Sequence, residues 1–539
     1  MNKSLIFGLV FVILLASAVS AKAVIPVYDC QVLDKPNRYY QLKNDVSLEP
    51  NEDICFTVTA NGVTLNMAGH SIIGSNEWGH GILNDGFDGL IIKNGKLSKF
   101  SFGIRIMNSS NNLLSDLSVT ESRNGIYLVQ TSNSLLKNSK INSGTTGIET
   151  TGIYLINGIN NTLIDITSQN NSRDVALLAE TDDQCQNTLN NVTVSENKKL
   201  FYFNEQISLS NFNAGAIILC GADNSTLTNL NISNTNHNNG LYIVRTDDSI
   251  FSNLKITGTY DGIFILDSDN NLVTSSTSTN NYYAGIGVWG ENNKIIGNKI
   301  NNNYYAGILA YFATNSVIKD NYIEYNSFGI YFDENEPVAT GIHVYNNLFR
   351  NTINFRADYE GNPNTWTEAL TSGFNIIGGS YIGGNFWANP SGTGFSETCE
   401  DENNDGICDE SYTIAEGNID YLPLTLKKVD FTDVAVDSIT ISPKEPQLGD
   451  NVKVSIILKN LGRMTTNVTY TTGITAPNGG FGGGNCPYCL QLRSNETHLI
   501  SLSFIASLPG QYSISANIVN SLIPDNKIQN NQLSLNFTI

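Results

Sequence analysis

The chain has 539 residues, which is too long for one ordinary hydrophobic core and predicts several domains or a repeat array. Charged residues make up only 15% of it, and 50 acidic against 30 basic residues give a formal charge of −20. Without a Lys/Arg cluster in the sequence, this charge excludes nucleic acid as an expected partner. It favours hard cations and works against strongly anionic polymers unless metal ions bridge the two.

The first residues predict export. Lys3 precedes an apolar run from Leu5 to Ala16, and small residues follow up to Ala21. The run is shorter than the roughly 20 residues of a membrane span. We therefore interpret residues 1–23 as a signal peptide and expect a secreted or cell-surface protein with no transmembrane segment after cleavage. An uncleaved membrane anchor is the alternative.

A repeat of about 22 residues occupies the middle of the chain. Its marker is Gly followed by Ile or Leu, at Gly81, Gly103, Gly125, Gly147, Gly240, Gly262, Gly285, Gly307 and Gly329. Sequences such as Gly103-Ile-Arg-Ile alternate buried and exposed positions, as a short strand does. Two or three strands fit one repeat, whereas helical repeats need more residues. The period therefore predicts an all-β fold, a parallel β-helix built as a solenoid of single coils.

Asparagines at the bends are predicted to stack from coil to coil. The residues assigned to one such position are Asn138, Asn229, Asn253, Asn298 and Asn321. Their amides could donate and accept hydrogen bonds along a ladder, which makes the asparagine content structural rather than catalytic.

These patterns predict five segments. Residues 1–23 are the signal peptide, 24–60 an N-terminal cap, 61–360 the β-helix, 361–428 its C-terminal cap and linker, and 429–539 a β-sandwich. The sandwich is predicted from alternating segments separated by Pro, Gly and Asn turns. Residues 174–215 break the period and are expected to form an enlarged coil.

Eight cysteines in an exported chain predict four local disulfides, because a solenoid brings only nearby coils together. The pairs are Cys30 with Cys55, Cys185 with Cys220, Cys399 with Cys408, and Cys486 with Cys489. The tetrapeptide Cys486-Pro-Tyr-Cys489 copies the glutaredoxin active site, but strand residues follow it where a helix would be needed. We therefore predict a structural disulfide in a Gly-rich loop.

An acidic segment at 401–410 has the ligand spacing of a calcium loop. Oxygen ligands at positions 1, 3 and 5, a carbonyl at 7 and a carboxylate at 9 suit Ca²⁺. The predicted ligands are Asp401, Asn403, Asp405, Ile407 and Asp409, with Asp420 considered as a late ligand. The alternative is an acidic turn held only by Cys399–Cys408. Copper is not expected, because the five histidines are scattered at 70, 80, 237, 343 and 498.

Aromatic residues recur on the exposed side of the marker strand and just before the marker. They are Tyr127, Tyr154, Tyr242, Phe264 and Tyr331 in one position, and Tyr260, Tyr283 and Tyr305 in the other. Two interpretations stay open. The rings could stabilise neighbouring coils, or they could form a stripe on which sugar rings pack.

Several segments resemble NosD-like right-handed β-helix proteins, which carry PbH1-type repeats. They are Leu65-Asn-Met-Ala-Gly-His-Ser-Ile-Ile-Gly74, Lys199–Asn204 followed by Ala214–Leu219, and the tail at 375–387 with Ile419–Leu424. The segment Asp433-Val-Ala-Val436 with Pro446–Asp450 and Lys459–Gly462 is similar to a CARDB module, an immunoglobulin-like adhesion domain of prokaryotic surface proteins. These resemblances imply a carbohydrate-related or adhesive role.

The sequence thus favours a non-catalytic surface or secreted protein that binds a glycan or another envelope component. The alternative is a polysaccharide lyase, epimerase or glycosidase on the same scaffold. The sequence identifies no catalytic residues, because no carboxylates precede the Gly79-His-Gly81 segment where such an enzyme would need them. A flank with two or more carboxylates beside an Arg or Lys would favour the enzyme.

Overall fold

The structure is a computed structural model that describes residues 24–75, 79–142, 150–234, 238–333, 339–358, 364–403, 405–426, 433–462, 464–521 and 528–539. The chain divides into two compact units, residues 1–202 and 203–539. The predicted signal peptide at 1–23 lies outside the described residues. Within them, no helix combines the length and the apolar character that a membrane span requires.

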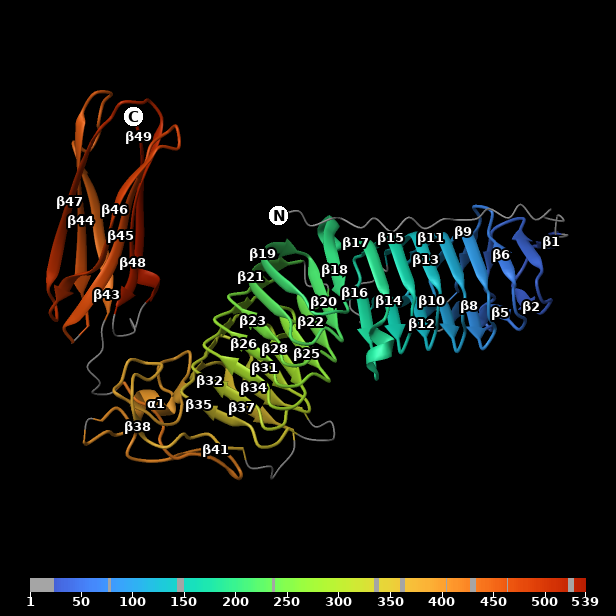
Figure 1. Ribbon diagram of the computed structural model, residues 1–539, viewed down its shortest axis with the longest axis horizontal. Coiled ribbons are helices and arrows are strands. Elements are labelled where there is room, and N and C mark those ends of the chain that lie inside the picture. The colour runs from blue at the N-terminus through green and yellow to red at the C-terminus, as the bar shows by residue number, and fades with distance from the viewer. Residues whose placement is uncertain are drawn as a thin grey trace, which may run out of the picture. The chain divides into compact units, whose positions relative to one another are not determined.

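In the first unit, successive strands stack into two parallel sheets (Figure 1). One sheet contains β1 (Val24–Val27), β3 (Tyr39–Leu42), β4 (Val46–Ser47), β6 (Thr64–Asn66), β7 (Ser71–Ile73), β9 (Ile91–Ser98), β11 (Leu113–Thr120), β13 (Leu135–Asn142), β15 (Thr162–Gln169) and β17 (Thr188–Val194). The other sheet contains β2 (Gln31–Leu33), β5 (Ile54–Val58), β8 (His80–Asp85), β10 (Phe102–Met107), β12 (Asn124–Val129), β14 (Thr151–Ile156) and β16 (Arg173–Leu178). The parallel β-helix predicted from the period is confirmed.

The interior is built by the alternation seen in the sequence. Ile104 of β10 pairs with Ile126 of β12, and both are fully buried. The marker glycine precedes these residues because neighbouring coils approach closely there. A Cβ atom on Gly103 would lie 2.7 Å from the carbonyl oxygen of Gly125 in the next coil. The marker is therefore a packing requirement of the coil.

Two sequence assignments in this unit need correction. Gly147 lies outside the described residues, and the position that pairs with the Gly125 coil belongs to Gly152, because Ile126 aligns with Ile153. An insertion thus lengthens this coil. The region that breaks the period contains a short 3-10 helix (Asp182–Cys185) and β18 (Lys198–Phe203), which pairs antiparallel with β17. We expected only an enlarged coil there.

The strands of the second unit also lie in two parallel sheets. One has β20 (Ala216–Cys220), β22 (Leu241–Val244), β25 (Ile263–Leu266), β28 (Ala284–Trp289), β31 (Ala306–Ala310), β34 (Phe328–Phe332) and β37 (Ile353–Ala357). The other has β19 (Ser208–Ala214), β21 (Thr226–Ser233), β23 (Ile250–Ser252), β24 (Lys255–Thr257), β26 (Leu272–Thr274), β27 (Thr277–Thr279), β29 (Lys294–Ile296), β30 (Lys299–Asn301), β32 (Val317–Lys319), β33 (Tyr322–Glu324), β35 (His343–Tyr345), β36 (Leu348–Arg350) and β40 (Phe386–Ala388).

The asparagine ladder exists, but its members differ from those predicted. Asn298 and Asn321 are buried, and the chain of amides continues through Asn347 to Asn385. Asn229 and Asn253 lie one position earlier in their coils, exposed and with positive φ angles. The sequence analysis assigned residues of two different positions in the coil to one ladder, because asparagine suits both a buried amide ladder and an exposed left-handed bend. The exposed Asn138 has the same backbone conformation.

After β37 the chain forms a cap from short elements. They are β38 (Thr371–Ser372), β39 (Tyr381–Ile382), α1 (Phe395–Thr398), β41 (Tyr412–Ala415) and β42 (Asn418–Asp420). Strand β40 lies within this segment and continues the stack by pairing with β36. Trp366 and Trp387 are both buried here, with ring centroids 5.8 Å apart. The cap thus supplies aromatic packing at this end of the stack.

The C-terminal strands form two antiparallel sheets. The first has β43 (Val434–Ser442), β44 (Asn451–Asn460) and β47 (Thr497–Ile505). The second has β45 (Thr466–Thr475), β46 (Phe481–Leu492), β48 (Gln511–Ser521) and β49 (Gln532–Thr538). Side chains from both sheets, including Val454 and Ile514, share one buried core. The Cys486 tetrapeptide lies inside β46 and not in a loop as predicted, at a register shift opposite Val468 and Tyr470.

Candidate carbohydrate-binding surfaces

Three aromatic side chains lie side by side on the second sheet of the first unit. Phe102 on β10, Tyr127 on β12 and Tyr154 on β14 belong to consecutive coils. The ring centroids are 5.1 Å apart at each step, in edge-to-face geometry. All three side chains are half-buried. Burial raises the pKa of Tyr127 and of Tyr154, so both phenols remain protonated donors at neutral pH.

Polar groups border these rings. The His80 ring stacks on Phe102 with centroids 5.0 Å apart, and the Arg105 guanidinium lies 5.0 Å from the Phe102 centroid. Burial and the nearby Arg105 charge lower the pKa of His80, so its imidazole is neutral at pH 7. His80 Nδ1 and Arg105 Nε are buried without a hydrogen-bond partner. We name His80, Phe102, Arg105, Tyr127, Tyr154 and Arg173 the arginine–aromatic face.

The aromatic residues predicted in the second unit mostly pack against one another. Tyr260 and Tyr331 are only 4% exposed, so their rings serve the packing of coils. Tyr283 and Tyr305 are half-buried and stack nearly parallel, with centroids 4.8 Å apart. The predicted pair Tyr242 and Phe264 is half-buried, with centroids 5.7 Å apart. In this unit the structure favours the coil-packing interpretation.

An exposed pair of tyrosines was missed by the sequence analysis. Tyr282 and Tyr304 are 51% and 73% exposed, and their rings stack with centroids 5.9 Å apart. The repeated Tyr-Tyr doublet was the available signal, since its second residue turns toward the core and its first toward solvent.

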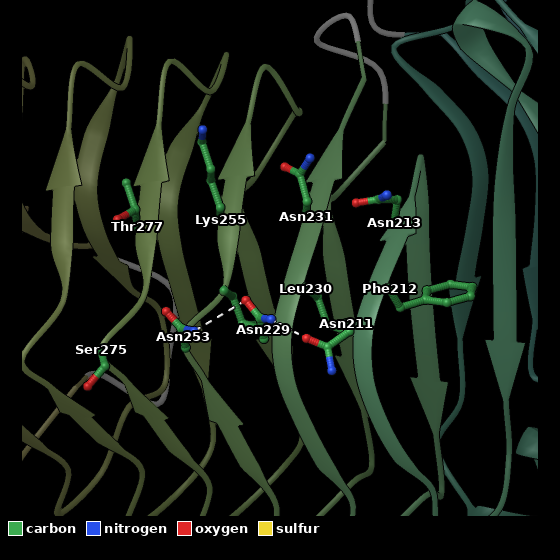
Figure 2. Close-up of a pocket in the computed structure, with 11 residues that line it drawn as sticks. Asn211, Phe212, Asn213, Asn229, Leu230, Asn231, Asn253, Lys255, Ser275 and Thr277 are labelled. Atoms are coloured by element: carbon green, nitrogen blue, oxygen red, sulfur yellow. Dashed lines mark hydrogen bonds between the residues drawn. The ribbon is translucent and has the colours of Figure 1, made fainter. Parts of the chain in front are cut away.

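A shallow groove of about 550 Å³ crosses strands β19, β21 and β24 of the second unit (Figure 2). Exposed amides run along it, and Asn253 donates to Asn229 over 3.3 Å. Asn229 in turn donates to Asn211. Lys255 projects beside them, and no carboxylate is among the lining residues. The groove offers donors and acceptors for hydroxyl groups but only one aromatic ring, Phe212.

The acidic loop is held by its own backbone. Asp401 is buried, and its two oxygens accept hydrogen bonds from the N–H groups of Asp405 and Gly406. Asp405 accepts from Ile407, and Asp409 accepts from Glu402. The Asn403 side chain accepts from Asp405 and also donates to it. Among the described residues, no three His, Cys, Asp or Glu side chains converge as metal ligands do. Calcium therefore remains a prediction.

Asp420 does not belong to this loop as a ligand. Its two carboxylate oxygens are fully buried and are occupied by four donors of the cap. The late-ligand assignment is therefore wrong, because those oxygens have no free direction for a cation.

The cysteines are oxidised throughout the described part of the chain, where no free cysteine occurs. The disulfides Cys30–Cys55 and Cys399–Cys408 are present as predicted. Cys185, Cys220 and Cys486 are each in a disulfide as well. The Cys399–Cys408 disulfide joins the residue that follows α1 to the acidic loop, so it holds the two ends of this segment together.

Two comparisons identify the class of fold. Residues 57–215 match the model of the right-handed β-helix region, and residues 196–392 match the model described as periplasmic copper-binding protein (NosD). The predicted resemblance to NosD-like right-handed β-helix proteins is confirmed. Among the histidines that the structure describes, His70 contacts Asp45, His80 stacks on Phe102 and His343 contacts a backbone carbonyl.

Several solved structures match this chain but share little sequence with it, and no curated protein matches it. The CARDB domain of a Pyrococcus furiosus protein in complex with di-metal ions is 18% identical, covering 20% of this chain and 94% of its own, with a TM-score of 0.17. The mannuronan C-5 epimerase AlgE6 A-module of Azotobacter vinelandii is 14% identical, with coverages of 64% and 89% and a TM-score of 0.28. The tailspike of E. coli bacteriophage HK620 with a hexasaccharide is 10% identical, with coverages of 89% and 86% and a TM-score of 0.31.

Proposed function

We propose that this protein is a secreted or cell-envelope β-helix protein that binds a polysaccharide through the arginine–aromatic face. The observation that carries the proposal is the row of Phe102, Tyr127 and Tyr154, which are half-buried in three consecutive coils. Sugar rings pack their apolar faces on such side chains, and the two phenols add hydrogen bonds. Rings repeated along the stack suit a chain of sugars better than a single sugar.

The face itself favours binding over hydrolysis. Its six residues include an imidazole, two guanidinium groups and three aromatic rings, but no carboxylate. General acid–base chemistry on a glycosidic bond generally uses a pair of carboxyl groups. The described disulfides support a compartment outside the cytosol.

The test is a binding measurement with a panel of polysaccharides, using the full chain and the double variant Tyr127→Ala, Tyr154→Ala. Losing two stacking platforms should weaken binding about tenfold or more. Tyr421→Ala is the matched control, because this ring is 65% exposed and lies in the cap. Products with unsaturated or new reducing ends would instead support the enzymatic alternative. Equal affinity of the double variant and the control would contradict the proposed site.

A further inference from the structure

We infer that the sugar units bound at the arginine–aromatic face carry an oxyanion, a carboxylate or a sulfate ester, and that Arg105 binds it. This inference rests on the proposed polysaccharide binding and names the class of polysaccharide. It starts from a cationic side chain that the protein holds in place but leaves without an acceptor.

Arg105 is held by stacking and not by an acidic partner. Its guanidinium lies over the Phe102 ring at 5.0 Å, and its Nε has no hydrogen-bond partner. Among the described residues, none forms an ion pair with it. A planar guanidinium fixed in this way presents its N–H groups in the fork that matches carboxylate and sulfate oxygens.

The surroundings of Arg105 are cationic in an acidic protein. Three of the nine arginines, at 105, 123 and 173, lie on this sheet or directly before one of its strands. Two acidic residues lie on or next to neighbouring strands of this sheet. Asp85 ends β8 and accepts a hydrogen bond from Asn108 over 2.8 Å, and Asp53 directly precedes β5. Although the whole chain has a net charge of −20, this face carries arginine side chains that attract anions.

The geometry joins the charge to the stacking platform. Arg105 and Tyr127 are direct neighbours in the parallel register of β10 and β12. Adjacent strands lie about 4.8 Å apart, so a sugar ring packed on Tyr127 has its substituents within reach of the guanidinium. Arg173 lies at the other end of the row, where it pairs with Thr151 in register, and its charge acts on Tyr154.

The test compares three polymers for binding to the full chain: a polyuronate, the same polymer with its carboxyl groups reduced to alcohols, and a sulfated polysaccharide. The variants are Arg105→Gln, which removes the charge, and Arg105→Lys, which keeps it without the fork. Lys140→Gln is the control, because Lys140 is exposed on β13 in the other sheet of the same unit. Circular dichroism melting curves check that each variant is folded.

We expect Arg105→Gln to weaken binding of an acidic polymer about tenfold or more, with Arg105→Lys in between and Lys140→Gln unchanged. Binding of the reduced polymer should be weak and insensitive to Arg105→Gln. Preference for the polyuronate or for the sulfated polymer identifies which oxyanion is recognised. Equal binding of the reduced polymer and of both acidic polymers, or equal losses in Arg105→Gln and Lys140→Gln, would overturn this inference alone. No binding to any polymer would overturn the proposed function as well.

Discussion

Asp420 in the cap gives the sharpest stability prediction. The side chain is fully buried, and its Oδ2 accepts from the backbone N–H of Asn385 over 2.7 Å and from Trp387 Nε1 over 2.8 Å. Its Oδ1 accepts from the Leu422 N–H and the Thr367 hydroxyl. Asp420→Ala would leave the first two donors buried without an acceptor. At about 1–3 kcal/mol for each, the cap should lose about 4 kcal/mol of stability.

The same carboxyl should make the cap sensitive to pH. Burial raises the pKa of Asp420 to about 6 from 3.8, although the four hydrogen bonds oppose this shift. Between these two values the folded state keeps the proton that the unfolded state has lost. Stability therefore falls as pH rises from about 3.8 to about 6 and then levels off. The shift corresponds to about 3 kcal/mol at most.

Asp420→Asn separates these two effects. The amide oxygen can still accept from Asn385 and Trp387, while its NH₂ group can donate to Thr367, so the loss should be about 1–2 kcal/mol. The pH dependence of the cap should disappear with the carboxyl group. We would follow the fluorescence of the buried Trp366 and Trp387 during urea unfolding at pH 4, 5, 6 and 7.5. An Asp420→Ala midpoint equal to that of the wild type, or an unchanged pH slope in Asp420→Asn, would refute the reasoning.

Three further predictions concern the amide ladder, the acidic loop and the cysteines. Asn321→Leu should destabilise the β-helix by about 3 kcal/mol in urea unfolding, because Asn321 forms hydrogen bonds with Ile295 O, Asn298 and Asn347. The control Asn253→Gly, at the exposed left-handed bend, should change stability by less than about 0.5 kcal/mol. Equal effects of the two substitutions would contradict the ladder. We propose that the acidic loop binds calcium. At a hundredfold excess over Kd, the bound ion stabilises the folded loop by about 2.7 kcal/mol. A chelator should therefore lower the melting temperature of the wild type but not of Asp405→Ala. Thiol titration of the unfolded, unreduced protein should find almost no reactive thiol, and two or more would contradict the predicted pairing.

The sequence predicted how each coil is built, but it did not predict which residues come together on the faces of the β-helix. The period, the marker glycine and the alternation at Gly103-Ile-Arg-Ile predicted the parallel strands, because a coil must bury the same positions in every turn. The position of each residue within the repeat was harder to predict than the length of the repeat. Asn253 and Asn298 differ by a single position, and with it one amide points to solvent and the other into the ladder. An insertion before Gly152 shifted the marker in the same way.

The C-terminal strands show a different limit. Glycines around Cys486 predicted a loop, yet they lie in β46, where pairing with β45 determines the conformation. Glycine has weak strand propensity, but backbone hydrogen bonds to a neighbouring strand do not depend on its side chain. Local composition therefore gave the wrong structure where tertiary pairing supplied the stabilisation.

The arginine–aromatic face explains why a search for charge clusters in the sequence found none. Arg105 and Arg173 are separated by three coils, and His80 precedes Arg105 by one coil, so no window of sequence contains them together. In a parallel β-helix each coil contributes one residue to each column, and a face consists of neighbouring columns along the stack. Such a face is flat and extends across coils, which offers a small ligand contact on one side only. A polymer gains contacts with every coil it crosses, and these weak contacts act together because they are linked. The architecture therefore favours an extended ligand for this face, whichever charge that ligand carries.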